Sequence, residues 1–159
     1  MSSASPPRLR LATVWLAGCS GCHMSLLDLD DWLFELARFA DVVYSPIASD
    51  CKTFPDNVDV VLVEGAVANA DNLALATRLR SCSRVVVALG DCAISGNVTA
   101  LRNLCLPPLQ RVVPLQAVIR VDLFVPGCPP SAARIRAVLE PLLHGRWPQL
   151  AGPDLLRFG

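Results

Sequence analysis

The chain has 159 residues and a mass of 17.1 kDa, which suits one domain with a full hydrophobic core. Apolar residues make up 53% and charged residues 18%, which excludes the disordered, collagen-like and coiled-coil classes. Fourteen basic side chains balance fourteen acidic ones without a basic stripe, so nucleic acid is not an expected partner. The mean hydropathy of +0.45 is high, yet no apolar run reaches the roughly 18 residues of a membrane span. We therefore expect another subunit to bury part of the apolar surface.

Apolar runs alternate with amphipathic segments along the chain. Such alternation predicts an α/β fold of the flavodoxin-like class, a doubly wound parallel sheet of about five strands covered on both faces. Residues 1–9 are expected to be a tail, 10–144 the domain, and 145–159 an extended tail docked on a partner. In chain order we predict a strand at 11–16, a helix at 24–40, strands at 41–44 and 58–63, a helix at 70–80, a strand at 84–89, a weaker helix at 98–104, a strand at 118–125 and a helix at 131–143.

The segment that ends at Cys19 has two interpretations. Residues 16–19 read Leu-Ala-Gly-Cys and resemble the cleavage box of a bacterial lipoprotein signal, which would make Cys19 a lipidated N-terminus. The apolar run before Cys19 has only eight residues, and Cys22 follows at metal-ligand spacing. The favoured interpretation is a buried strand that ends in a cysteine loop of a cytoplasmic protein.

Four of the seven cysteines follow predicted strands. Cys19 and Cys22 come after the first strand, Cys92 after the fourth and Cys128 after the fifth. Because ligands collect at the carboxyl ends of parallel strands, we expect these thiols to converge at one edge of the sheet. Four thiolates suit an iron–sulfur cube or a tetrahedral zinc site. The odd number of cysteines points away from a disulfide framework and toward metal or redox chemistry in a reducing compartment.

Residues beside these cysteines are candidates for the environment of a cluster. Gly21 and Gly127 permit tight turns and close backbone approach, so that amide N–H groups can point at sulfur. Glu64 follows the third strand at the same edge, either as a charge or proton-relay group or as a solvated loop carboxylate. His23 is a ligand, an acid–base group or simply a residue that lines the loop.

Two other classes of protein share parts of this pattern. A thioredoxin-like dithiol oxidoreductase also places Cys-x-x-Cys between a strand and a helix, and it would use Cys19 and Cys22 alone. A structural zinc module would bind the same four cysteines without redox chemistry. Cys51, Cys82 and Cys105 are interpreted as ordinary thiols, with Cys51 the best candidate to replace a ligand because it follows the second strand.

Four motifs, taken together, resemble those of the small subunit of nickel–iron hydrogenases, over roughly residues 10–143. The resemblance implies that the four cysteines of the predicted edge bind one proximal 4Fe–4S cluster. It also implies that the cluster faces a nickel–iron centre in a separate, obligate large subunit, which carries the catalytic ligands. The motifs are Cys19-x-x-Cys22, Val63-Glu64-Gly65-Ala66, Gly90-Asp91-Cys92-Ala93 and Pro126-Gly127-Cys128-Pro129-Pro130.

Departures from the family pattern favour one branch of it. The related complex I subunit has adjacent cysteines in its first motif, so the two-residue spacing here favours the hydrogenase branch, with a complex I-like iron–sulfur subunit as the alternative. Many hydrogenase small subunits carry Ser-Glu after the second cysteine, where this chain has His23-Met24, so a proton-path role is not carried over. No twin-arginine signal or further cysteine/histidine cluster is present. This resembles the cytoplasmic NAD-reducing type, which implies iron–sulfur and flavin diaphorase subunits as further partners.

Overall fold

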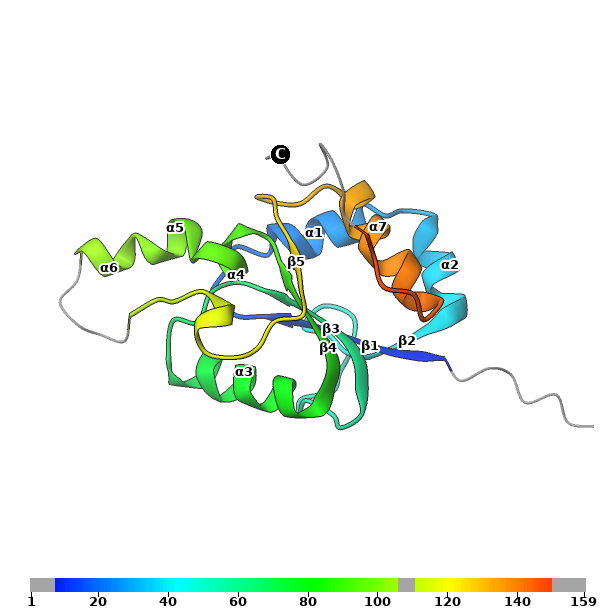
Figure 1. Ribbon diagram of the computed structural model, residues 1–159, viewed down its shortest axis with the longest axis horizontal. Helices are drawn as coiled ribbons and strands as arrows, with labels where there is room; N and C mark the ends of the chain where they lie inside the picture. Colours follow the sequence, from blue (N-terminus) through cyan, green and yellow to red (C-terminus); the bar gives the residue numbers. More distant parts are fainter. Residues whose placement is uncertain (1–7, 106–110, 150–159) are drawn as a thin grey trace, which may run out of the picture.

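A computed structural model describes residues 8–105 and 111–149, and its centre is a parallel five-stranded sheet (Figure 1). The strand order is β2-β1-β3-β4-β5, with every neighbouring pair parallel. This is the doubly wound order of flavodoxin-like folds, so the predicted fold class is confirmed. The strands are β1 (Leu9–Trp15), β2 (Ala40–Tyr44), β3 (Val58–Glu64), β4 (Ser83–Leu89) and β5 (Leu123–Val125).

Helices cover both faces of this sheet because its strands are apolar on both sides. Leu11 and Leu62 pack toward α1 (Gly21–Leu27), α2 (Trp32–Phe39) and α7 (Ala132–Leu143), whose apolar residues share their core cluster. The alternate residues Ala12 and Val61 pack toward α3 (Ala70–Cys82) on the opposite face (Figure 1). Shorter elements follow β4, namely α4 (Asp91–Ser95), α5 (Asn97–Ala100), α6 (Arg102–Cys105) and the 3-10 helix η1 (Leu115–Ala117).

The prediction of one continuous helix over 24–40 is wrong. The structure has two helices there, α1 and α2, separated by residues 28–31. Asp30 adopts a left-handed conformation with φ of 48°, which a continuous helix does not allow. Asp28, Asp30 and Asp31 crowd this segment, and short carboxylate side chains compete with helical backbone hydrogen bonds.

The fifth strand is shorter than the predicted range 118–125. Only Leu123–Val125 pairs with β4, because the preceding chain turns inward as η1 and buries Ile119 in the core on the α3 side. The carboxylate of Asp122 accepts the backbone N–H of Val86 at 2.8 Å, where a longer strand would offer a carbonyl. The weak helix predicted at 98–104 is likewise divided, into α5 and α6.

The ends of the chain bear on the predicted domain limits. β1 begins at Leu9, inside the predicted N-terminal tail, and residues 1–7 lie outside the described part. Of the predicted tail at 145–159 the structure describes only 145–149, which form no helix or strand. Within the described ranges, no helix has the length and apolar character needed to cross a membrane.

Candidate functional site: the cysteine edge

β1, β4 and β5 are parallel, so their carboxyl ends lie at one edge of the sheet (Figure 1), and the four predicted cysteines follow these ends in the chain. The chain passes from β1 to Cys19 and Cys22 at the start of α1, from β4 to Cys92 in α4, and from β5 to Cys128. We call these four residues the cysteine edge. All seven cysteines of the chain are free thiols.

The Cys22 thiol lies in a buried environment of negative potential. Burial raises the pKa of the Cys22 thiol far above its usual range, and Glu64, Cys92, Cys19 and Cys128 add to the rise. Each of these neighbours is negative when ionised, so each opposes a thiolate at Cys22. A cationic metal centre supplies the opposite charge and favours thiolates at the same positions.

The thiol of Cys92 has a similar but milder environment. Burial raises its pKa, hydrogen bonds from Thr99 and Asn97 lower it, and Cys128 and Cys19 raise it again. Cys19 and Cys128 are themselves exposed. The cysteine edge is therefore buried on the Cys22 side and open to the surface on the other.

Two glycines let the backbone approach the thiols where a side chain would not fit. Gly90 has φ of +84°, and a Cβ built on it would lie 2.3 Å from the sulfur of Cys22. Gly21 lies against the first thiol, since its Cβ would be 3.3 Å from the sulfur of Cys19. Bare backbone thus lies against the sulfurs of Cys22 and Cys19, where any larger residue would crowd the thiol.

Asp91 ties the second and third cysteine loops together. Its carboxylate accepts the backbone N–H of Gly127 at 2.8 Å, and its own N–H donates to the Gly127 carbonyl at 2.9 Å. The N–H of Gly127 itself is thus bonded to a carboxylate and is not available to a sulfur. Gly127 itself is needed for its φ of +141° and because a Cβ would lie 2.4 Å from Pro130 Cα.

Glu64 is not a solvated loop carboxylate, since only 1% of its surface is exposed. It ends β3 and accepts hydrogen bonds from two atoms of His23, which is also 1% exposed. The sequence placed Glu64 at this edge but gave no sign that His23 pairs with it. Such a pairing depends on how α1 folds back over β3.

Asn97 is a site residue that the sequence did not indicate. Its side-chain N–H group donates to the sulfur of Cys128 at 3.3 Å. Asn97 follows Gly96 and begins the short helix α5, and a Gly-Asn pair is typical of an ordinary turn. Its left-handed φ of 41° aims the side chain back toward the cysteine edge.

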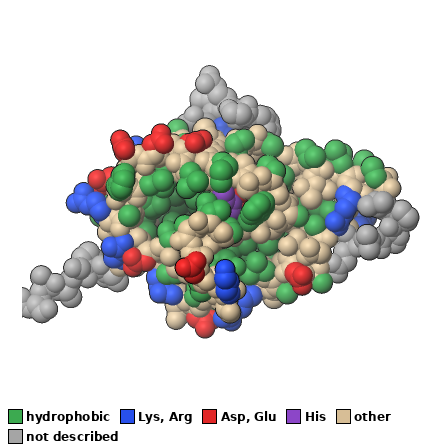
Figure 2. Space-filling model, turned by 180° about the vertical axis from the view of Figure 1, so that it is seen from behind, with side chains coloured by type: hydrophobic (Ala, Val, Ile, Leu, Met, Phe, Trp, Pro, Cys, Tyr) green, Lys and Arg blue, Asp and Glu red, His purple; other side chains and the backbone are tan. Residues whose placement is uncertain are grey.

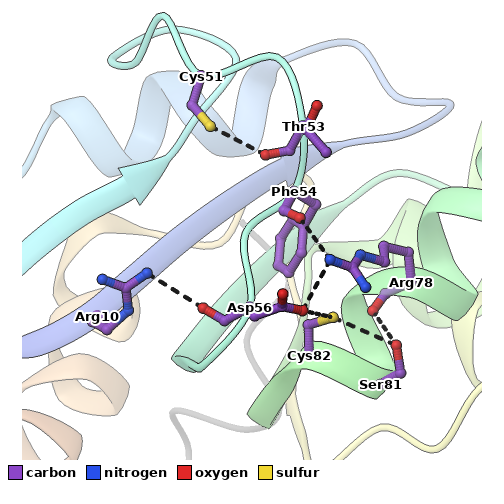
Figure 3. A network of polar contacts seen from close by, with 8 residues as sticks. All are labelled: Arg10, Cys51, Thr53, Phe54, Asp56, Arg78, Ser81 and Cys82. Carbon is purple, nitrogen blue, oxygen red and sulfur yellow. Dashed lines mark hydrogen bonds and ion pairs between the residues drawn. The ribbon is translucent and has the colours of Figure 1, made fainter.

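The remaining cysteines lie elsewhere. Cys51, predicted as a possible substitute ligand, donates to the carbonyl of Thr53 at 3.1 Å, and Cys82 donates to the carboxylate of Asp56 at 3.2 Å (Figure 3). Cys105 is exposed at the end of α6. No three His, Cys, Asp or Glu side chains within 8–105 and 111–149 are arranged to hold a single metal ion. A cube differs in this respect, because each of its irons takes its own thiolate.

Comparison with known proteins identifies the family. Residues 19–142 match the family described as NADH ubiquinone oxidoreductase, 20 Kd subunit. A subunit of the F420-non-reducing hydrogenase vhu of Methanocaldococcus jannaschii is 36% identical, with 89% of this chain and 58% of that protein covered. NAD-reducing hydrogenase HoxS subunit delta of Cupriavidus necator is 30% identical, with 87% of this chain and 80% of that protein covered. The chain thus spans less than two thirds of the length of the first of these relatives.

A solved structure gives the same result in three dimensions. In a crystal structure of an NAD+-reducing [NiFe]-hydrogenase in the H2-reduced state, one chain superposes with a TM-score of 0.88 at 36% identity. The superposition covers 96% of this chain and 100% of that chain. The chain therefore belongs to the family of the NADH ubiquinone oxidoreductase 20 Kd subunit, and its relatives within that family are subunits of hydrogenases.

Proposed function

We propose that the chain is the electron-transfer small subunit of a nickel–iron hydrogenase and binds one proximal 4Fe–4S cluster through Cys19, Cys22, Cys92 and Cys128. The observation that carries this proposal is the convergence of four free thiols from three strand ends at one edge of the sheet. Gly90 and Gly21 support the proposal, because they leave the Cys22 and Cys19 sulfurs free of neighbouring side chains on those sides.

Such a cluster supplies one-electron chemistry when it is bound. The chain's own residues provide its surroundings. Cys22 is the buried ligand, and the exposed Cys19 and Cys128 are the ligands nearest the surface. Asp91 holds the Cys92 and Cys128 loops at a fixed separation through two hydrogen bonds. Asn97 donates to the Cys128 sulfur, a contact that favours the reduced cluster.

We further propose that a large subunit with a nickel–iron centre is the obligate partner, as the hydrogenase relatives suggest. Large apolar side chains are exposed along α5 and α6, which begin at Asn97 beside the cysteine edge. Hydrophobic side chains gather at this end of the molecule in Figure 2. A subunit seated there would remove this surface from water, which accounts for the high mean hydropathy. The exposed residues are Val98, Leu101 and Leu104.

For the electron acceptor we propose NAD, reached through iron–sulfur and flavin diaphorase subunits in the cytoplasm. The match over a whole chain of an NAD+-reducing hydrogenase supports this choice, and free thiols suit a reducing compartment. The F420-non-reducing relatives, at similar identity, favour a second candidate, a hydrogenase with another acceptor. The acceptor therefore has to be tested separately from the cluster.

The test is to purify the tagged chain anaerobically from its own host with whatever accompanies it. We expect about four iron and four sulfide per chain, nickel in a co-purifying subunit, and H2-dependent reduction of NAD. Iron and sulfide without nickel would favour the complex I-like alternative. Zinc alone would indicate a structural module, and a metal-free reactive dithiol a thioredoxin-like enzyme. Hydrogen uptake that reduces an artificial dye but not NAD would overturn the acceptor alone.

A further inference from the structure

A histidine and a glutamate are buried together against the cysteine edge, and the electron relay described above assigns them no role. Glu64 and His23 are each 1% exposed. The backbone N–H of His23 donates to Glu64 Oε2 at 3.0 Å, and His23 Nδ1 lies 2.5 Å from the same oxygen. Two nitrogens of one residue thus hold a single carboxylate oxygen from two directions.

This carboxylate is fixed beside the Cys-x-x-Cys loop. Glu64 is the last residue of β3 and pairs in register with Trp15, from which the chain continues to Cys19. Its Oε2 is bonded to the peptide nitrogen that directly follows Cys22. Its Oε1 would lie 3.3 Å from a Cβ built on Gly18, the residue before Cys19. Oε2 thus contacts the backbone directly after Cys22, and Oε1 lies on the side of Gly18, where a side chain would meet it.

The hydrogen-bond chemistry defines what His23 contributes. An ionised carboxylate only accepts hydrogen bonds, so an oxygen with two nitrogen partners suits the ionised form. When Nδ1–H donates to it, a neutral imidazole keeps a lone pair on Nε2. That Nε2 is buried and has no hydrogen-bond partner among the described residues. Among the described residues, the one hydrogen-bond partner of the His23 ring is therefore Glu64.

We propose that His23 is a positioning residue that fixes the Glu64 carboxylate beside Cys22, and that this fixed negative charge lowers the reduction potential of the cluster. The inference rests on the proposed function. Nearby charge and burial are among the properties that set cluster potentials, and a buried charge is poorly screened by solvent. The effect of Glu64 on the Cys22 thiol, where it is the largest contribution after burial, is consistent with such a field.

Two amide substitutions of His23 separate hydrogen bonding from space filling. The side-chain amide of Asn ends at the position of Nδ1, so His23→Asn keeps a donor for Glu64. The amide of Gln ends near Nε2, so His23→Gln fills more of the imidazole volume but loses that donor. A positioning role predicts a wild-type potential for His23→Asn and a raised one for His23→Gln. If His23 only fills space, we expect the opposite, with a wild-type potential for His23→Gln and a shifted potential for His23→Asn.

The measurement is an EPR-monitored redox titration of the complex, purified anaerobically with its accompanying subunits and assayed for iron and sulfide. We expect the potential to rise most in Glu64→Gln, which removes the charge, and less in His23→Gln. The double variant should match Glu64→Gln alone, because His23 acts through Glu64. His144→Gln and Glu35→Gln are matched surface controls and should leave the potential unchanged.

Several results would overturn the inference. The first is that the variants keep full iron and sulfide and their cluster potentials do not change. The second is that the potential of His23→Asn shifts as far as that of His23→Gln. The third is that the shifts of Glu64→Gln and His23→Gln add up in the double variant. A cluster kept in His23→Asn but lost from His23→Gln would mean that the hydrogen bond is needed to retain the cluster. That result would also overturn the inference. If Glu64→Gln does not load a cluster, the comparison of the two His23 variants decides, since both retain Glu64. A wild-type chain without iron and sulfide would instead refute the proposed function itself.

Discussion

Two regions of the molecule contain thiols in opposite settings. At the cysteine edge, four thiols follow the carboxyl ends of three neighbouring strands, and Asn97 donates to the sulfur of one of them, Cys128. In and near the loop that precedes β3, two other thiols each have an oxygen acceptor: Cys51 donates to the Thr53 carbonyl and Cys82 to the Asp56 carboxylate (Figure 3). A thiol with its own acceptor is satisfied as it stands. At the cysteine edge, burial and the neighbouring thiols raise the pKa of Cys22 and Cys92, and a shared cation would offset that rise.

The strongest way to break this comparison is to remove one thiol from each region. Cys92→Ser should reduce the iron of the purified chain from about four per chain to near none, because a cube needs its full set of thiolates. Cys82→Ser should keep all of it, since a serine hydroxyl also donates to Asp56. Iron and sulfide assays on both variants check this. Equal iron in the two would remove the distinction between the regions.

The backbone of the cysteine edge is expected to tolerate substitution less than the backbone elsewhere. Gly90→Ala forces a left-handed φ of +84° on alanine and sets its Cβ against the Cys22 sulfur, so it should cost about 3 kcal/mol or more. Gly145→Ala, with φ of +66° and open space around the Cβ, should cost about 1 kcal/mol. Urea denaturation of the metal-free chains compares them. Similar costs would mean that strain, not contact with sulfur, decides.

Outside the site, the stability lost on neutralising a charged side chain should increase with the burial of that side chain. Asp122 is 8% exposed; burial alone would raise the pKa of its carboxyl, but Arg80, the N–H of Val86 and Arg120 outweigh that effect and hold the pKa below its usual range. Asp122→Asn should therefore cost about 2 kcal/mol at neutral pH. Asp56→Asn, at a side chain 69% exposed, should cost less than about 1 kcal/mol.

The contribution of the Asp122 carboxyl to stability depends on pH with a definite sign. A depressed folded pKa contributes stability above the unfolded pKa of about 3.9, and the contribution is lost as the pH falls through the folded value. The difference in unfolding free energy between wild type and Asp122→Asn should accordingly shrink below about pH 4. Denaturation curves from pH 7 to pH 3 measure it. A difference that grows in acid would contradict the assignment.

The smallest expected effect concerns a single hydrogen bond to sulfur. Asn97→Gly removes the donor to Cys128 and tolerates the left-handed φ of 41°. Because hydrogen bonds to sulfur favour the reduced cluster, the potential should fall slightly. Asn57→Gly is the matched control at φ of 58°, in the loop before β3. A redox titration in which both variants shift alike would show that loop flexibility is responsible.

The sequence predicted the sheet and the four cysteines for the same reason. Three strands, β1, β4 and β5, are apolar runs followed closely by glycine and cysteine, so a local pattern indicated both the fold class and the edge. What it missed depends on contacts between segments far apart. The partnership of His23 with Glu64 spans 41 residues, and that of Asn97 with Cys128 spans 31. The inward turn before β5 was missed because residues 118–125 have the composition of a strand, while the core on the α3 side required Ile119.

The last strand carries a consequence for how the protein is made. β5 has three residues, pairs only with β4, and presents Cys128, so the fourth thiol reaches the edge only after all five strands have been synthesised. Parallel strands far apart in sequence assemble slowly, because loop closure precedes any gain from contacts. Until β5 docks, only three of the four thiols of the cysteine edge are in place. If this edge binds a cluster as proposed, the cluster would load only after the last strand has joined the sheet.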